Sequence, residues 1–147
     1  MKIYIGSDHG GFELKEKIGV WLTENGYEVE DLGAHELTED DDYPDFIFPV
    51  GEKVAPESGS RGIILGRSGN GEAIAANKVK GVRAAVCTNV EMAKKAREHN
   101  DANVLSIGAD FVDETLAIEI VKVFLETEFS NEERHKRRLE KIEKYEG

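Results

Sequence analysis

A glycine-flanked loop near the N-terminus carries two side chains that could do chemistry. Within Gly6-Ser7-Asp8-His9-Gly10-Gly11, Asp8 and His9 stand just before a predicted helix. Glycines let a ligand approach the backbone closely, and a helix N-terminus favours an anion. Asp8 could instead cap the helix, whereas a core histidine is unusual among glycines in a turn. This loop is therefore a candidate binding site for a charged ligand.

A second loop, Gly66-Arg67-Ser68-Gly69-Asn70-Gly71-Glu72, is also rich in glycine. Its backbone N–H groups could hold a phosphate or a developing oxyanion. The spacing Gly-x-x-Gly-x-Gly matches neither a dinucleotide fingerprint nor a Walker loop. Glu72 falls in the first turn of the next helix, where a carboxylate either stabilises the helix or serves as a base.

Further candidates are spread along the chain. His99, followed by Asn100, either ends a helix or acts as an acid–base group, because histidine titrates near neutral pH. Tyr43 either packs in a turn or faces a ligand. Arg134 and Arg138 are four residues apart and should project from the same side of a predicted helix. They either form a solvated face of that helix or bind a phosphate through their guanidinium groups.

Alternating strand and helix patterns must position these loops. Short apolar runs predict five strands, and helical spacing predicts the segments between them. We therefore expect an α/β, three-layer Rossmann-like fold with a five-stranded parallel sheet, in a single domain spanning residues 1–147. Ligands bind such sheets at the carboxyl ends of the strands. The expected strands are 2–6, 27–32, 62–65, 82–87 and 104–107, and the main expected helices begin at Phe12 and span 44–55, 73–77, 90–99 and 114–129.

The tail, residues 131–147, is almost entirely charged except for Leu139, Ile142 and Tyr145. These three lie at i, i+3 and i+6, which predicts a helix with one apolar stripe. Such a stripe needs a surface to cover it, so we expect the tail helix to reach a partner subunit.

Composition excludes several classes of protein. The 147 residues carry a net charge of −11, which argues against nucleic-acid binding. No apolar run approaches the roughly 18 residues of a membrane span, and no signal-peptide pattern is visible, so we expect a cytoplasmic protein. The single cysteine, Cys87, is interpreted as a buried, inert thiol. His35 lies in an acidic segment that we interpret as a solvated loop, so no metal site is predicted.

Seven short motifs occur in a fixed order along the chain. They are Gly6-Ser7-Asp8-His9-Gly10-Gly11, Asp31-Leu32-Gly33, Asp42-Tyr43-Pro44-Asp45, Ser68-Gly69-Asn70-Gly71-Glu72, Ala75-Ala76-Asn77-Lys78, Arg97-Glu98-His99-Asn100 and Arg134-His135-x-x-Arg138. Together they resemble the motifs of ribose-5-phosphate isomerase type B and the related galactose-6-phosphate and allose-6-phosphate isomerases. The resemblance implies an aldose–ketose isomerase that interconverts ribose 5-phosphate and ribulose 5-phosphate without metal or cofactor. It also implies a dimer or tetramer in which each active site is built from two subunits.

The same resemblance implies a role for each candidate. Glu72 is the implied proton-shuttling base, because Gly66 stands where other members carry a cysteine base. His99 resembles the acid that opens the furanose ring, and Arg134 and Arg138 resemble phosphate ligands. The remaining implied substrate-binding positions are Asp8, His9, Tyr43, Arg67, Ser68, Gly69, Asn70, Gly71 and Asn100.

One departure from the family pattern concerns the substrate. Asp110 stands where many relatives carry a phosphate-binding arginine, and Arg67 stands where glycine is frequent. We expect the two to pair if their loops meet. The same chemistry on a tetrose or hexose phosphate, or a non-catalytic sugar-phosphate binder, remains an alternative. A flavodoxin-like nucleotide binder is disfavoured because no dinucleotide fingerprint is present.

Overall fold

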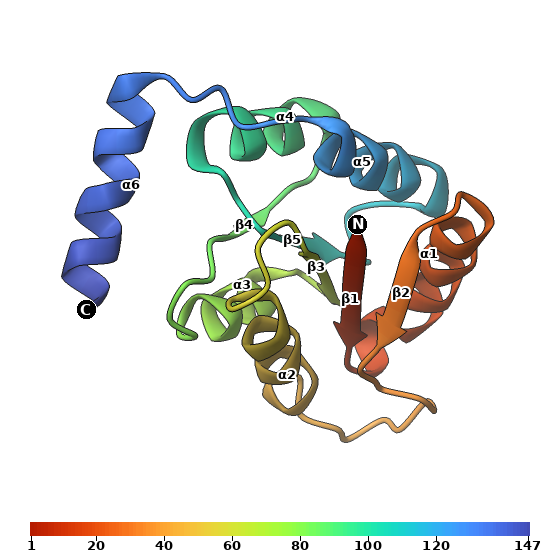
Figure 1. Ribbon diagram of the computed structural model, residues 1–147. Helices are drawn as coiled ribbons and strands as arrows, with labels where there is room; N and C mark the ends of the chain where they lie inside the picture. The colour runs from red at the N-terminus through yellow and green to blue at the C-terminus, as the bar shows by residue number, and fades with distance from the viewer.

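The computed structural model describes residues 1–147 and contains one five-stranded parallel sheet covered by helices on both faces (Figure 1). The strand order is β2-β1-β3-β5-β4, and every neighbouring pair is parallel. The predicted α/β class is confirmed. The strands are β1 (Lys2–Ser7), β2 (Glu28–Asp31), β3 (Arg61–Gly66), β4 (Ala84–Val86) and β5 (Val104–Gly108). The helices are a 3-10 turn (His9–Gly11), α1 (Phe12–Glu24), α2 (Pro44–Val54), α3 (Asn70–Asn77), α4 (Val90–Asn100), α5 (Glu114–Glu126) and α6 (Glu133–Glu146).

Alternating side chains of the central strands fill two hydrophobic cores. Ile3, Ile5 and Ile63 point to the face covered by α1, α4 and α5. Tyr4 and Ile64 point to the opposite face, which α2 and α3 cover. Because both faces are buried, the central strands are almost continuously apolar, as parallel sheets require.

Element ends differ from the sequence-based expectation where side chains intervene. The fourth strand is shorter than 82–87, since the Val82 N–H donates to Val79 O within a turn. The fifth long helix ends at Glu126 and not at residue 129, because Thr127 is extended and its hydroxyl donates to Val123 O. Its carbonyl in turn accepts from Arg97 Nε.

The two edges of the sheet carry different loops. The pairings Ser7 with Leu65 and Gly66 with Gly108 bring the loops after β1, β3 and β5 together at the carboxyl edge. Helix α4 runs antiparallel to the strands and ends just before β5 begins, so His99 and Asn100 lie at the amino edge. Five strand residues at about 3.3 Å each separate the two edges by about 15 Å.

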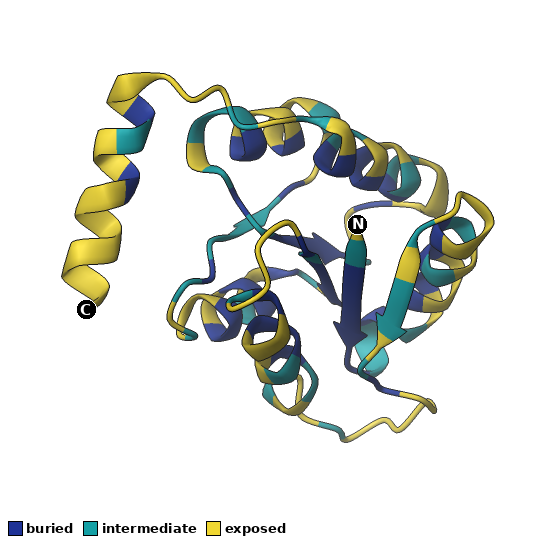
Figure 2. Cartoon of the chain, viewed as in Figure 1, coloured by how far each residue is buried: buried dark blue, intermediate teal, exposed yellow.

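The tail forms the expected helix, α6, whose first half stands beside the end of α4 (Figure 1). Only His135 and Leu139 of this helix are buried, and Ile142 and Tyr145 are exposed (Figure 2). No helix in the structure combines the length and apolar character needed to cross a membrane.

Candidate active site

Glu72 lies in the first turn of α3 at the carboxyl edge of the sheet, as its position in the sequence predicts. The residue is 4% exposed, and its Oε1 has no hydrogen-bond partner. The side chain fits because Gly66, at the end of β3, lacks a Cβ: an added Cβ would lie 2.2 Å from the Glu72 Cδ. A buried carboxylate with a free oxygen is available to react.

Burial raises the pKa of Glu72, and the nearby Asp8 carboxylate raises it further. Both effects disfavour the charged form, one by desolvation and the other by like-charge repulsion. A carboxyl group whose pKa is raised above its ordinary value is a stronger base once ionised and holds the proton it has removed until that proton is returned.

The glycine-rich loop before Glu72 is held against the end of β5. Gly69 adopts a left-handed conformation with φ of 82°, and its carbonyl accepts a 2.7 Å hydrogen bond from Ser106 Oγ. The Asn70 N–H donates to Ser68 Oγ at 3.2 Å. Tyr43 packs over Gly71, whose added Cβ would lie 2.7 Å from the tyrosine ring. Tyr43 therefore belongs to this group of residues.

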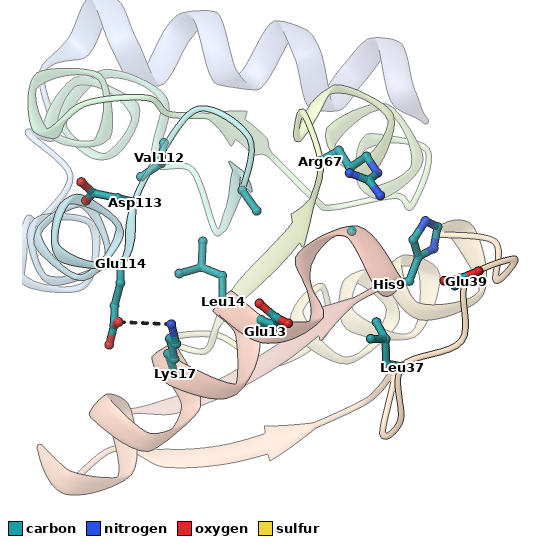
Figure 3. Close-up of a pocket in the computed structure, with 12 residues that line it drawn as sticks. His9, Glu13, Leu14, Lys17, Leu37, Glu39, Arg67, Val112, Asp113 and Glu114 are labelled. Carbon is teal, nitrogen blue, oxygen red and sulfur yellow. Dashed lines mark ion pairs between the residues drawn. The ribbon is translucent and has the colours of Figure 1, made fainter.

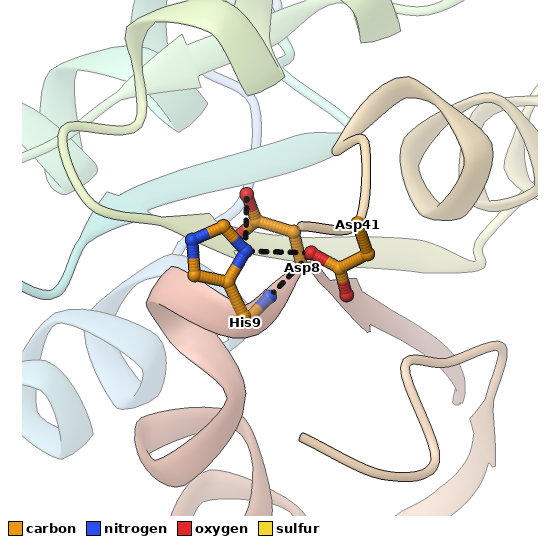
Figure 4. A group of neighbouring side chains, drawn as sticks. All are labelled: Asp8, His9 and Asp41. Atoms are coloured by element: carbon orange, nitrogen blue, oxygen red, sulfur yellow. Dashed lines mark hydrogen bonds and ion pairs between the residues drawn. The ribbon is translucent and has the colours of Figure 1, made fainter. Parts of the chain in front are cut away.

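Asp8 and His9 face this loop from the end of β1 (Figure 4). Asp8 caps the 3-10 turn by accepting from the Gly10 N–H at 3.0 Å, so the cap is present, and the substrate-binding role of Asp8 stays a prediction. His9 Nδ1 lies 2.6 Å from Asp41 Oδ1 and 3.9 Å from Asp8 Oδ2. These three residues form the one cluster whose groups could hold a metal ion. The Nδ1 and Oδ1 atoms are already paired with each other by a direct hydrogen bond.

A cavity of about 430 Å³ adjoins the site on the side of His9 and Arg67 (Figure 3). Arg67 lines this cavity and pairs with Asp110, as expected, with Nη1 and Oδ1 3.9 Å apart. The side chains are 66% and 54% exposed, which makes this a solvated ion pair. The other charged lining residues are Glu13, Lys17, Glu39, Asp113 and Glu114.

The remaining candidates form a second group at the opposite edge. His99 and Asn100 end α4, and Arg134 and Arg138 are exposed residues of the first half of α6. Within one chain the structure does not bring these four residues to Glu72. The first group therefore lies at the carboxyl edge of the sheet and this group at the amino edge, and the binding role of both groups stays a prediction.

Two residues near the candidates were not predicted from sequence. Asp41 contacts His9, although it lies in an acidic segment interpreted as a solvated loop. His135 stacks on His99 with ring centroids 4.4 Å apart, and burial, followed by the neighbouring His99, lowers the His135 pKa. The sequence signal that could have indicated His135 was its place between Arg134 and Arg138 in the tail motif. No sequence feature distinguished Asp41 from its acidic neighbours.

Comparison with known proteins identifies the family. The sequence pattern described as ribose/galactose isomerase matches residues 3–142. The chain belongs to this family of sugar-phosphate isomerases. It is 44% identical to ribose-5-phosphate isomerase B of Mycolicibacterium paratuberculosis over 146 residues, which cover 99% of this chain and 92% of the relative.

Solved structures agree with this assignment. Ribose-5-phosphate isomerase B of Clostridium thermocellum is 50% identical and superposes with a TM-score of 0.93, covering 99% of this chain and 97% of the other. The Mycoplasma genitalium enzyme, solved with bound ribulose 5-phosphate, is 43% identical with a TM-score of 0.95, covering 99% and 95%. The sequence-based recognition of the family is therefore confirmed.

Proposed function

We propose that this protein interconverts ribose 5-phosphate and ribulose 5-phosphate through an enediolate, with Glu72 as the base. The observation that carries the proposal is the buried Glu72 carboxylate, with an unpartnered oxygen, next to a glycine-rich turn. The names of the similar proteins support the choice of pentose phosphate.

The reaction needs one proton moved between adjacent carbons. Glu72 removes the proton from C2 of the open-chain aldose and returns it to C1. The C1 oxygen gains a proton to become a hydroxyl, and the C2 hydroxyl loses its proton as C2 becomes the carbonyl carbon, so no proton is gained or lost overall. Backbone N–H groups of residues 67–71 stabilise the enediolate oxygen as its charge develops. The raised pKa of Glu72 stabilises the protonated form of its carboxyl group, which must then donate the proton to C1.

A second copy of the chain completes each site in this proposal. Ring opening by His99 and phosphate binding by Arg134 and Arg138 require residues at the edge opposite Glu72. A separation of about 15 Å exceeds the reach of one pentose phosphate across a single chain. The exposed Ile142 and Tyr145 on α6 are suited to contact a partner in the same assembly.

Replacement of the base tests the chemistry. Glu72→Gln keeps the shape of the side chain but cannot accept the proton, so turnover of ribose 5-phosphate should fall by about three orders of magnitude or more, with KM little changed. Glu91→Gln is the matched control, since Glu91 also stands in a helical first turn, that of α4, and is exposed. Near-normal turnover by the Glu72 variant would reject the assignment.

Complementation tests the shared site separately. Glu72→Gln and His99→Asn chains, co-expressed with different affinity tags, form a doubly tagged dimer. If each site draws on both chains, one of its two sites contains neither change, and about half of the parent activity should return. Failure of an isolated, stable heterodimer to regain activity would place Glu72 and His99 in the same chain's site.

A sugar phosphate of another length is the second candidate substrate. The observation that favours it is Asp110, an anion paired with Arg67 beside the cavity. Comparing kcat/KM for four-, five- and six-carbon aldose phosphates decides between the candidates.

A further inference from the structure

One carboxylate in the acidic segment between β2 and α2 is set apart from its neighbours. The Asp41 side chain is 10% exposed, whereas Glu39, Asp40 and Asp42 are exposed residues. Burial of a carboxylate is costly unless a partner compensates for lost hydration. His9 supplies a partner for Oδ1 of Asp41, whereas the buried Oδ2 has no hydrogen-bond partner.

A single oxygen of Asp41 contacts His9 twice. Oδ1 accepts the His9 backbone N–H at 3.0 Å and lies 2.6 Å from the ring Nδ1. Two contacts from one atom fix both the backbone and the ring of His9. Figure 4 shows the second ring nitrogen directed away from both carboxylates.

The hydrogen bond determines which ring nitrogen can meet a ligand. With Nδ1–H donating to Asp41, Nε2 is the free atom, and His9 lines the cavity of about 430 Å³ together with Arg67. We propose that Asp41 is a positioning residue that holds His9 so that Nε2–H donates to the anionic group of the sugar phosphate. This inference rests on the proposed function and extends it to a residue outside the family motifs described above.

The charges around His9 favour the protonated ring. The Asp41 hydrogen bond has the largest effect and raises the pKa of His9. Burial and Arg67 oppose this rise, and the charges of Asp8, 3.9 Å away, and Asp41 add to it. The imidazolium therefore persists to higher pH than in an ordinary histidine. It loses its proton, and its charge-assisted hydrogen bond to the ligand, as pH rises through the raised pKa.

Asp41 also tethers its loop, and a variant must separate that role from the positioning of His9. The loop is already anchored at its start by the Ser7 N–H to Gly33 O bond at 2.8 Å and by the Ala34 N–H to Ser7 O bond. Asparagine at residue 41 retains an oxygen that can accept both His9 contacts. Asp41→Asn therefore removes the charge and largely keeps the tether.

The first measurement is KM for ribose 5-phosphate in the parent and Asp41→Asn at about pH 6 and about pH 8, on either side of the ordinary histidine pKa. The variant-to-parent KM ratio should be close to one at the lower pH and about tenfold at the higher, the size expected for a lost charge-assisted bond. Titration of the substrate phosphate cancels in this ratio. Asp40→Asn, which removes a charge from the adjacent exposed residue, should leave the ratio near one at both values.

The second measurement does not depend on turnover. Ring ¹⁵N shifts of His9 in the ligand-free protein, assigned with a His9→Asn variant, should show its pKa falling towards the ordinary value in Asp41→Asn but not in Asp40→Asn. An unchanged His9 titration, or a KM ratio that is equal at both pH values, would overturn the role of Asp41. Absence of parent activity on ribose 5-phosphate, with the titration altered as expected, would instead reject the proposed substrate.

Discussion

Adding one methyl group at Gly66 should displace the proposed base without touching the rest of the site. A Cβ there would lie 2.2 Å from the Cδ and Oε1 of Glu72 and 2.5 Å from its Oε2. Ordinary van der Waals contact begins at 3.4 Å, so the carboxylate must retreat by about 1.2 Å (3.4 − 2.2). The carboxylate is the mobile end of a side chain, so it moves more readily than the strand.

The expected loss of catalytic rate follows from the geometry of proton transfer. A misplacement of about 1 Å costs about 10²-fold in rate, or about 2.7 kcal/mol in the activation free energy. Gly66→Ala should therefore lower kcat about 10²-fold. KM should change by less than about twofold, because Glu72 acts mainly in the transition state.

Initial rates of ribose 5-phosphate isomerisation give kcat and KM of the Gly66→Ala variant, and thermal unfolding checks that the variant is folded. Gly19→Ala is the matched control, since a Cβ at Gly19 in α1 meets nothing within 4 Å. It should leave kcat unchanged and increase the free energy of unfolding by about 0.5–1 kcal/mol. A folded Gly66→Ala protein with parental kcat would refute the link between the position of the carboxylate and catalysis.

Three further predictions concern other parts of the chain. Arg67→Ala should raise KM at least tenfold, about 1.4 kcal/mol of binding free energy, if Arg67 contacts the phosphate or a sugar hydroxyl. Loss of its exposed ion pair with Asp110 would cost only about 0–1 kcal/mol in the free energy of unfolding. An unchanged KM would exclude the contact between Arg67 and the substrate. His99→Asn should slow the turnover of cyclic ribose 5-phosphate but leave the turnover of ribulose 5-phosphate unchanged, because ribulose 5-phosphate has no furanose ring to open. Initial rates that fall equally in both directions would contradict a role of His99 confined to ring opening. Burial raises the pKa of Cys87 to about 11, so the thiol should stay protonated and resist alkylation at pH 8, with activity retained, as mass spectrometry and rate assays can show.

Local sequence patterns were enough to predict most of the helices and strands and the fold class. The alternation of apolar runs with helical spacing predicted the five parallel strands, and the glycine loop placed Glu72 in the first turn of α3 as found. These features depend on residues close together in the chain, which sequence periodicity reports directly. The ends of β4 and α5 were less predictable. A local turn between Val79 and Val82 shortens β4, and beyond the end of α5 the Thr127 carbonyl accepts from Arg97 of α4, a contact that periodicity cannot report.

Only the tertiary structure decided which candidates meet. Strand order and helix direction put Glu72 and His9 at one edge and His99 at the other. It also separated Asp41 from the equally acidic residues beside it, since a buried contact with His9 depends on how two distant loops pack. Sequence specifies side-chain types, but burial, pairing and pKa depend on distances across the fold.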